Sequence, residues 1–408
     1  MRKGHVIMRL RLLVTCVPLA VALAIATPAA GQIGATPLAP GVTAERAPGW
    51  TVTPAFDYAF VWDSNVLFDN IGSPLVSEGQ HVFKPNGLLA FRSPRTRFDA
   101  QYNGAFVQHP ELTSLNSYDQ RLSLNSVHQL TRRISWLVRH DATIAPTTEL
   151  QELVGLPFTR LGVHREEFRT GLDLLTDRQT QLGVTYRFQW VDFKPNIDGV
   201  EVLDGGHNHG GNVKLRRSIT RRVTLAGEYD LQLATVIDGG RFQIQNSWGG
   251  VEYRVTEHVQ AFGGLGVSHL SGAEGQPART GPSVRVGVQR RTPSADLSVS
   301  FHKSYVPVYG FGGTSDNQEL TTRLLLPVAR RWVVNGSASL RQNEPLALEG
   351  FSLRSVWFYG GVGYLLTDWM RLEAYSSGVK QMSDQVDGRI NRYTFGLQVT
   401  AATTTRIR

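Results

Sequence analysis

Charged side chains that recur singly along the chain are the residues best placed to do chemistry. Thirteen basic residues fall on the polar phase of an alternating pattern: Lys84, Arg121, Arg139, Arg169, Arg187, Lys214, Arg216, Arg285, Arg323, Arg341, Arg354, Arg371 and Arg392. Nine acidic residues share that phase: Asp57, Asp99, Asp141, Asp173, Glu228, Asp230, Asp296, Glu319 and Glu373. Inside a channel such charges select ions, and the excess of positive ones predicts a modest preference for anions. The alternative is that most of them pair across neighbouring strands and only stabilise the wall.

Other groupings that could support catalysis or metal binding are weak. His207 and His209 lie two apart in a glycine-rich segment, but a metal site needs further ligands. Ser126 and His140 share one face of adjacent predicted strands, as in a lipid-facing hydrolase, whereas Asn125, the nearest third residue, points to the other face. Acidic residues stand singly beside arginine, so no carboxylate pair is set apart for glycoside hydrolysis. We therefore expect no enzyme activity, no metal and no cofactor.

The positions of these residues depend on an alternation that runs from about residue 50 to residue 401. The stretch 181–190 shows it most clearly, with Leu182, Val184 and Tyr186 on one face and Gln181, Thr185 and Arg187 on the other. A period of two is the signature of a β-strand with one apolar face. About eighteen such stretches follow one another, and their connections alternate in length. Short connections include 93–96, 131–133 and 176–178, and long ones include 63–80, 145–165 and 194–206.

This asymmetry predicts the fold class. A closed barrel in a bacterial outer membrane has tight turns in the periplasm and long loops outside. We predict an all-β fold, a transmembrane up-and-down antiparallel barrel of about 18 strands (16 to 18) that occupies residues 50–401. An even strand number places both chain ends on the periplasmic side.

The first 31 residues have the pattern of an export signal. Basic residues precede the apolar run Leu12–Ala26, and the segment Thr-Pro-Ala-Ala-Gly follows it. This is the order of a cleaved secretory signal peptide. Residues 32–49 are predicted to be an irregular periplasmic lead-in, and residues 402–408 a C-terminal tail. The only cysteine, Cys16, lies within the predicted signal, so thiol chemistry is not expected in the exported chain.

Bulk composition excludes few function classes. The apolar fraction of 41% is typical of membrane barrels too, because only alternate residues meet lipid. The net charge of +8 would suit a nucleic-acid partner if it were gathered on one stripe. The basic residues are scattered singly instead, so we expect no nucleic-acid binding.

Aromatic residues and one change of phase give local predictions. Two interfacial belts are expected, one near the short turns (Trp136, Tyr253, Trp332, Tyr364 and Trp369) and one near the long loops (Trp62, Trp190 and Tyr305). The stretch 241–253 changes phase between Trp248 and Val251. A β-bulge at Gly249 and Gly250 would explain that change.

The export signal, the even run of strands and the threonine-centred short turns resemble bacterial porin-type outer-membrane β-barrel proteins. The final strand, Arg-Tyr-Thr-Phe-Gly-Leu-Gln-Val at 392–399, is similar to their C-terminal assembly signal, although this chain continues beyond it. The resemblance implies a Gram-negative cell envelope, contact with outer-membrane lipid, insertion by the barrel-assembly machinery and passage of small hydrophilic solutes. The alternative function is a structural or partner-binding barrel with a closed lumen, serving envelope polysaccharide or secretion machinery. The solute and the oligomeric state stay open.

The connection 145–165 is more apolar than an open-water loop should be. Its apolar residues are Leu150, Leu153, Val154, Leu156, Phe158 and Leu161. In typical porins the third long loop folds inward and narrows the pore, and this connection has the equivalent place. We expect it to form a constriction, with packing across the mouth or against a neighbouring protomer as the alternative.

Overall fold

The structure is a computed structural model of the 408-residue chain. It describes residues 48–68, 74–148, 159–194, 203, 205–237, 240–272, 277–292, 295–310, 313–346, 352–384 and 389–407. The predicted signal (1–31) and most of the predicted lead-in therefore lie outside the described residues.

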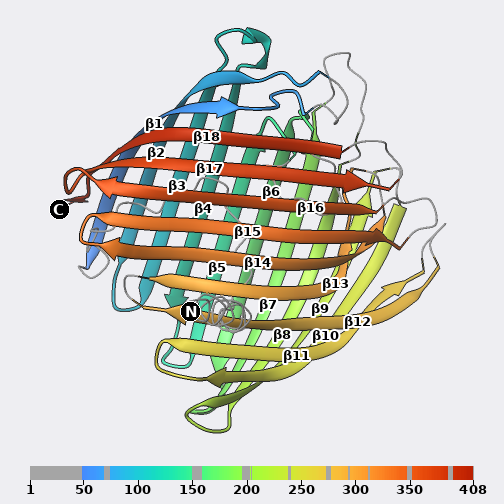
Figure 1. Cartoon of the computed structure of the whole chain (residues 1–408). Coiled ribbons are helices and arrows are strands. Elements are labelled where there is room, and N and C mark those ends of the chain that lie inside the picture. Colours follow the sequence, from blue (N-terminus) through green and yellow to red (C-terminus); the bar gives the residue numbers. More distant parts are fainter. Residues whose placement is uncertain are drawn as a thin grey trace, which may run out of the picture.

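Eighteen long strands form a single antiparallel sheet in which each strand pairs with the next, and the short β19 pairs with β1 (Figure 1). β1 pairs with β2 on one side and with β18 on the other, so the sheet closes into a barrel. The predicted all-β up-and-down barrel is confirmed, at the upper end of the predicted strand number. The described residues contain no helix that is long and apolar enough to cross a membrane.

The strands run from the short-turn end to the long-loop end and back. Their bounds are β1 (Gly49–Asp63), β2 (Glu78–Arg92), β3 (Thr96–Gln108), β4 (Ser117–Gln129), β5 (Ile134–Ala145), β6 (Val163–Leu175), β7 (Thr180–Phe193), β8 (Gly206–Ser218), β9 (Val223–Val236), β10 (Gly240–Arg254), β11 (Val259–Ser271), β12 (Arg279–Arg291), β13 (Asp296–Pro307), β14 (Thr314–Ala329), β15 (Trp332–Pro345), β16 (Leu353–Leu365), β17 (Met370–Ser383), β18 (Arg389–Ala402) and β19 (Thr405–Ile407). One short 3-10 helix, η2 (Thr113–Leu115), lies between β3 and β4.

The alternation works as the sequence predicts on most strands. On β1, Phe56 and Phe60 are 47% and 46% exposed on the outer face, while Asp57 and Ala59 between them are 2% and 0% exposed on the inner face. An apolar outer band with a polar interior is the arrangement of transmembrane β-barrels.

The short turns share a hydrogen-bonding device as well as a length. Thr131, Thr220 and Thr256 each accept, through Oγ1, the backbone N–H groups two and three residues ahead. Asp177 does the same with its carboxylate, at 2.6 Å from the Gln179 nitrogen and 2.7 Å from the Thr180 nitrogen. Because these N–H groups stabilise the charged form, beginning with that of Gln179, the pKa of Asp177 is lowered from its ordinary value. Side-chain oxygens at this offset close the turn locally.

The seam that closes the barrel is interrupted at Pro54. β18 pairs with β1 over Ala55–Asp63, and β19 pairs with Trp50–Val52. Proline has no N–H to offer a ladder, and between the two paired stretches the Thr403 nitrogen donates to the Pro54 carbonyl at 3.2 Å. Residues expected to be a tail therefore lengthen the wall.

The alternation of connection lengths has one exception. β9 ends at Val236 and β10 begins at Gly240, so their connection is three residues long at the long-loop end. The prediction that short and long connections alternate along the whole barrel is wrong here. The sequence pattern ends the ninth predicted strand at Leu233, because apolar Ala234 and Val236 fall on the face that is polar elsewhere. In the structure both residues continue β9 on the inner face, where they are 2% and 1% exposed.

The predicted bulge at Gly249 and Gly250 is also wrong. β10 pairs with β9 and β11 residue by residue through both glycines, without a register shift. The phase changes because Phe242 and Ile244, near the long-loop end, are buried on the inner face at 5% and 0% exposure. Part of the inner wall is thus apolar.

The end of β13 leaves the wall and explains that apolar region. Its ladder with β12 stops at the pair Val284–Lys303, and Arg279–Ser283 of β12 pair only with β11. The Tyr305 backbone then lies on the inner faces of β11 and β10. Its N–H donates to Ser268 Oγ at 3.3 Å, and its carbonyl accepts from Asn246 Nδ2 at 3.3 Å.

The segment beyond this point is called the inner hairpin and comprises the described residues 304–310 and 313–315. Val308 donates its backbone N–H to the Gly313 carbonyl at 3.1 Å, and Gly310 and Gly313 have φ angles of +101° and +98°, which favour glycine. Tyr309 Cδ1 would lie 3.2 Å from a Cβ placed on Gly206 of β8. The hairpin therefore crosses the inner wall from β12 to β8.

Candidate solute pathway in the barrel lumen

The long-loop half of the lumen is packed along β6–β13. Side chains of the inner wall, the inner hairpin and the neighbouring loops form one buried apolar cluster. Its members are Leu161, Val163, Val191, Phe193, Leu203, Ala234, Val236, Phe242, Ile244, Leu270, Tyr305, Tyr309 and Leu346. Tyr305, predicted for the outer aromatic belt, is only 5% exposed inside the barrel. That prediction is wrong because β13 turns inward after Lys303.

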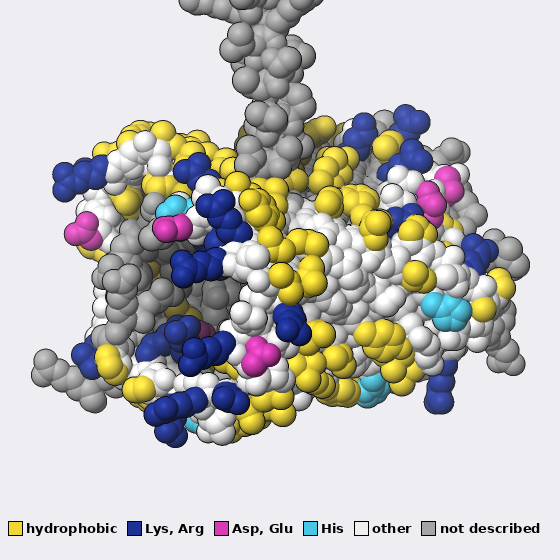
Figure 2. All heavy atoms as spheres, turned by 90° about the horizontal axis from the view of Figure 1, so that it is seen from below, with side chains coloured by type: hydrophobic (Ala, Val, Ile, Leu, Met, Phe, Trp, Pro, Cys, Tyr) yellow, Lys and Arg dark blue, Asp and Glu magenta, His cyan; other side chains and the backbone are white. Residues whose placement is uncertain are grey.

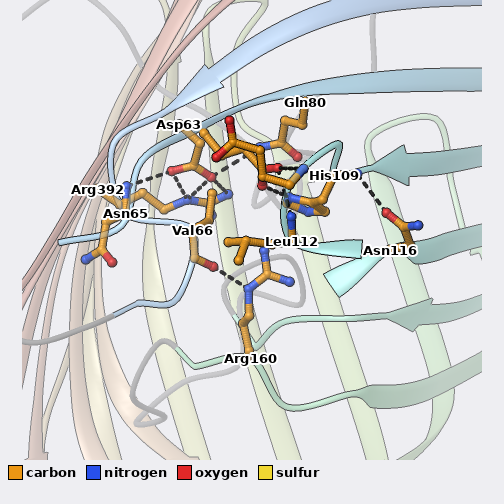
Figure 3. Close-up of polar contacts among 11 residues, drawn as sticks. Asp63, Asn65, Val66, Gln80, His109, Leu112, Asn116, Arg160 and Arg392 are labelled. Carbon is orange, nitrogen blue, oxygen red and sulfur yellow. Dashed lines mark hydrogen bonds and ion pairs between the residues drawn. The ribbon is translucent and has the colours of Figure 1, made fainter. Parts of the chain in front are cut away.

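The described part of the first long loop, residues 64–68, is packed against the barrel wall at the long-loop end. Asp63, whose side chain is fully buried, pairs with Arg392 at 2.7 Å and accepts from Gln80 Nε2 at 3.2 Å (Figure 3). The Arg392 guanidinium lies 4.5 Å from the centre of the Phe68 ring. Val66, in the same loop, is 0% exposed. The segment 64–68 is thus packed against the end of β18.

The third long loop meets the first one across the mouth. Arg160 Nε donates to the carbonyl of Val66, as Figure 3 shows. At the base of the loop, the Thr148 nitrogen donates to the Thr159 carbonyl at 3.0 Å. Leu161 belongs to the buried cluster with 6% exposure. The other predicted constriction residues lie outside the described part of the chain: Leu150, Leu153, Val154, Leu156 and Phe158.

The short-turn half of the lumen is open to solvent. Several side chains that face inward there are nevertheless exposed: Asn125, Arg139, Arg169, Lys214 and Arg323. Inward orientation follows from the pairing register, since Lys214 and Arg323 each stand beside a residue with an outward side chain, Leu215 and Leu324. A side chain that faces inward and is still exposed requires a water-filled space inside the barrel. Four of the five lie closer to the short turns than to the long loops, and Arg169 lies at the middle of β6.

Twelve of the thirteen predicted lumen cations face inward, and Arg354 does not. Arg354 stands two residues before Val356, which pairs with the outward Leu340, and its own side chain is exposed on the outer face. The prediction for Arg354 is wrong because Arg354 shares the outward phase of Val356 and Phe358 on β16, which does not change along the strand. The inward set is Lys84, Arg121, Arg139, Arg169, Arg187, Lys214, Arg216, Arg285, Arg323, Arg341, Arg371 and Arg392.

Most of this positive charge is paired. Nine of the twelve form ion pairs with a carboxylate: Arg121, Arg139, Arg169, Arg187, Arg216, Arg285, Arg341, Arg371 and Arg392. Lys84 instead donates to Gln398 Oε1 at 3.0 Å. Lys214 and Arg323 make no ion pair within the described residues. Exposed cations without a carboxylate partner contribute most to the field that a passing ion meets.

A cavity of about 610 Å³ lies at the short-turn end of the lumen. Its lining comes from β8–β11 and the turns beside them: Gln179, Arg216, Ser218, Thr220, Arg221, Arg222, Thr224, Glu252, Arg254 and Gln260. Figure 2, which views the molecule from below, shows a hollow at its left with Lys and Arg side chains gathered around it. The sequence pattern singled out only Arg216 from this group, because Arg221 and Arg222 lie in a turn and Arg254 lies one residue beyond the predicted strand 241–253.

The other predicted groupings lie on the outer face of the barrel. Ser126 pairs with Val138, and His140 pairs with Leu124, so the serine and the histidine are diagonal neighbours on the outer face. His209 is also outward and its Nδ1 lies 2.7 Å from the hydroxyl of Tyr186. Within the described ranges, no group of three or more potential ligands gathers to hold a metal.

No protein-family model matches the chain, and no curated protein matches its sequence. Among solved structures, OccAB4 of Acinetobacter baumannii is 9% identical with a TM-score of 0.46, covering 88% of this chain and 99% of that one. OccK3 (OpdO) of Pseudomonas aeruginosa is 11% identical with a TM-score of 0.44, covering 87% and 96%. The siderophore receptor PirA of Pseudomonas aeruginosa is 10% identical with a TM-score of 0.43, covering 88% and 80%.

Proposed function

We propose that the chain is an outer-membrane pore for small hydrophilic solutes with a mild preference for anions. The observation that carries the proposal is the solvent-exposed state of inward-facing Arg139, Arg169, Lys214 and Arg323. Charged side chains on an inner wall stay exposed only where water fills the barrel. Barrels of sixteen or more strands have room for such an aqueous channel.

Anion preference follows from the imbalance of unpaired charge. The charges within the nine ion pairs largely cancel. Among the other inward charges predicted from the sequence, three cations (Lys84, Lys214 and Arg323) and two carboxylates (Asp57 and Asp173) make no ion pair within the described residues, which leaves a small excess of positive charge. A few unpaired charges in a wide lumen bias the ion flux modestly without excluding cations.

We propose that the inner hairpin is the main constriction on the β8–β12 side of the pore. The third long loop is proposed to narrow the pore further through Leu161 and the other apolar residues predicted for the constriction. The hairpin covers the β8–β12 side of the long-loop mouth with a buried apolar cluster, whereas the short-turn end has a cavity. The pathway is therefore a funnel, wide at the short turns and narrow at the long loops.

Purified protein refolded into a planar bilayer should show stable conductance steps. Such steps, with outer-membrane fractionation of the exported chain, support the pore. We also propose that residues 1–31 are a cleaved signal and that the barrel-assembly machinery inserts the chain.

The second candidate is a partner-binding barrel with a closed lumen, associated with envelope polysaccharide or secretion machinery. The packed long-loop half is the observation that favours it, because loops that pack inside the mouth present a fixed outer surface. A bilayer that stays silent while the loops retain a polysaccharide or a secretion component would favour this function.

A further inference from the structure

We propose that the cavity at the short-turn end of the lumen is a binding site for small multivalent anions that carry phosphate or carboxylate groups. This inference rests on the proposed pore function and deepens it, since it gives the pathway a specific solute class at a specific place. The site is defined by Arg216, Arg221, Arg222, Arg254 and Glu252.

The cavity faces the lumen and not the lipid. Arg216, Glu252 and Arg254 have the inward phase of their strands, because Leu215, Val251 and Tyr253 beside them are 50%, 43% and 41% exposed on the outer face. The volume of about 610 Å³ falls within the usual range of small-molecule sites. A free solute in the lumen can therefore enter it, whereas a lipid headgroup at the outer face cannot.

Four guanidinium groups meet one carboxylate in this cavity. Glu252 is already engaged, because it pairs with Arg216 and accepts from Gln260 Nε2 at 3.1 Å. Arg221, Arg222 and Arg254 make no ion pair within the described part of the chain. The lining therefore has an excess of three positive charges. Guanidinium groups bind phosphate and carboxylate through paired N–H groups, which makes arginine the usual residue at such sites.

The backbone holds the unpaired guanidinium groups together against their repulsion. Thr220 Oγ1 accepts from the backbone nitrogens of Arg222 and Val223 at 3.1 and 3.0 Å, which fixes the turn. The Arg254 nitrogen donates to the Arg222 carbonyl at 2.7 Å, so the end of β10 is joined to that turn. Like charges held close are relieved by a bound anion, and more strongly by one that carries several charges.

The lumen beyond the cavity also favours the arrival of an anion. Lys214, two residues before Arg216 on β8, is exposed on the inner wall and makes no ion pair within the described residues. Positive charges along a water-filled wall concentrate anions near it. Anions should therefore reach the site from the lumen, and the affinity of the site for them should be highest at low ionic strength and fall as salt is added.

A second Thr-Arg-Arg turn in the chain provides a matched control. The turn between β4 and β5 carries the same Thr-Arg-Arg segment at 131–133, with the same Thr131 Oγ1 hydrogen bonds. Arg132 and Arg133 are at the same end of the barrel but do not line the cavity. Replacing either pair with alanine removes the same charge from an equivalent turn.

The test is calorimetric titration of the refolded protein with pyrophosphate at low ionic strength. The wild type should bind it, R221A/R222A should bind at least about tenfold more weakly, and R132A/R133A should bind like the wild type. Equal weakening by both pairs would show a diffuse charge effect and overturn the site, as would a wild type that binds no pyrophosphate.

Conductance of the same samples separates this inference from the pore proposal. Conductance without pyrophosphate binding overturns the site and leaves the pore. Binding that is lost only in R221A/R222A supports the site even if the bilayer stays silent, and the pore proposal then fails alone.

Discussion

Ser268 on β11 accepts a hydrogen bond from the backbone N–H of Tyr305 on β13, at 3.3 Å, although β12 lies between the two strands in the wall. An inner-wall side chain thereby replaces a ladder partner that the β13 backbone has lost. Backbone groups inside a membrane barrel must be satisfied within the protein. The contact thus offsets the hydrogen bond that the β13 backbone loses when it turns inward. The first prediction tests this contact.

Removing the side chains that hold the Tyr305 backbone should loosen the inner hairpin. In N246A/S268A we expect a loss of about 1 kcal/mol for each hydrogen bond and larger current fluctuations in single-channel records, because the hairpin detaches more often. The control is S300A, which removes a serine hydrogen bond inside the β13–β14 ladder. Fluctuations that rise equally in the control would show that the inner contact has no special role.

The buried pair Asp63–Arg392 should stabilise the seam between β1 and β18. The Asp63 side chain is fully buried, so in D63N the buried guanidinium loses its counter-charge at a cost of about 3 kcal/mol. The change should appear as a lower temperature for the shift in heat-modifiable gel migration. D296N is the control, since its partner Arg291 is 65% exposed and exposed pairs contribute little. An unchanged transition in D63N would contradict the assignment.

Charge reversal inside and outside the barrel should have different effects on selectivity. K214E/R323E places negative charge on the inner wall and should move the ion preference towards cations. R354E makes a similar change on the outer face and should leave the preference unchanged. The measurement is the zero-current potential of each variant in a salt gradient, and equal shifts in both would refute the inward assignment.

Deleting residues 148–160 should raise single-channel conductance, because the third long loop contacts the first loop through Arg160 and Val66. R160Q removes the hydrogen bond to Val66 and keeps the loop, and it should give a smaller rise. A conductance that does not change on deletion would assign the constriction to the inner hairpin alone.

The alternating pattern predicted the barrel and its strand number, because an apolar outer face and a polar inner face impose a period of two. It failed at β10 and at Tyr305 for one shared reason. Where the inner hairpin covers the wall, the inner face is apolar, so Phe242 and Ile244 reverse the pattern. A local period cannot reveal that β13 crosses to β8, since the contacts of Tyr309 and Ser268 join distant segments. Arg221 and Arg222 were missed because turn residues have no strand phase, and Arg254 because the predicted strand ended at residue 253.

The central claim is that the barrel contains a water-filled lumen with excess positive charge in its short-turn half. The most direct measurement is the zero-current potential of the refolded protein in a planar bilayer under a potassium chloride gradient. The account predicts stable conductance and a potential whose sign shows chloride to be modestly preferred over potassium. A silent bilayer, or a potential that shows potassium to be preferred, would contradict it.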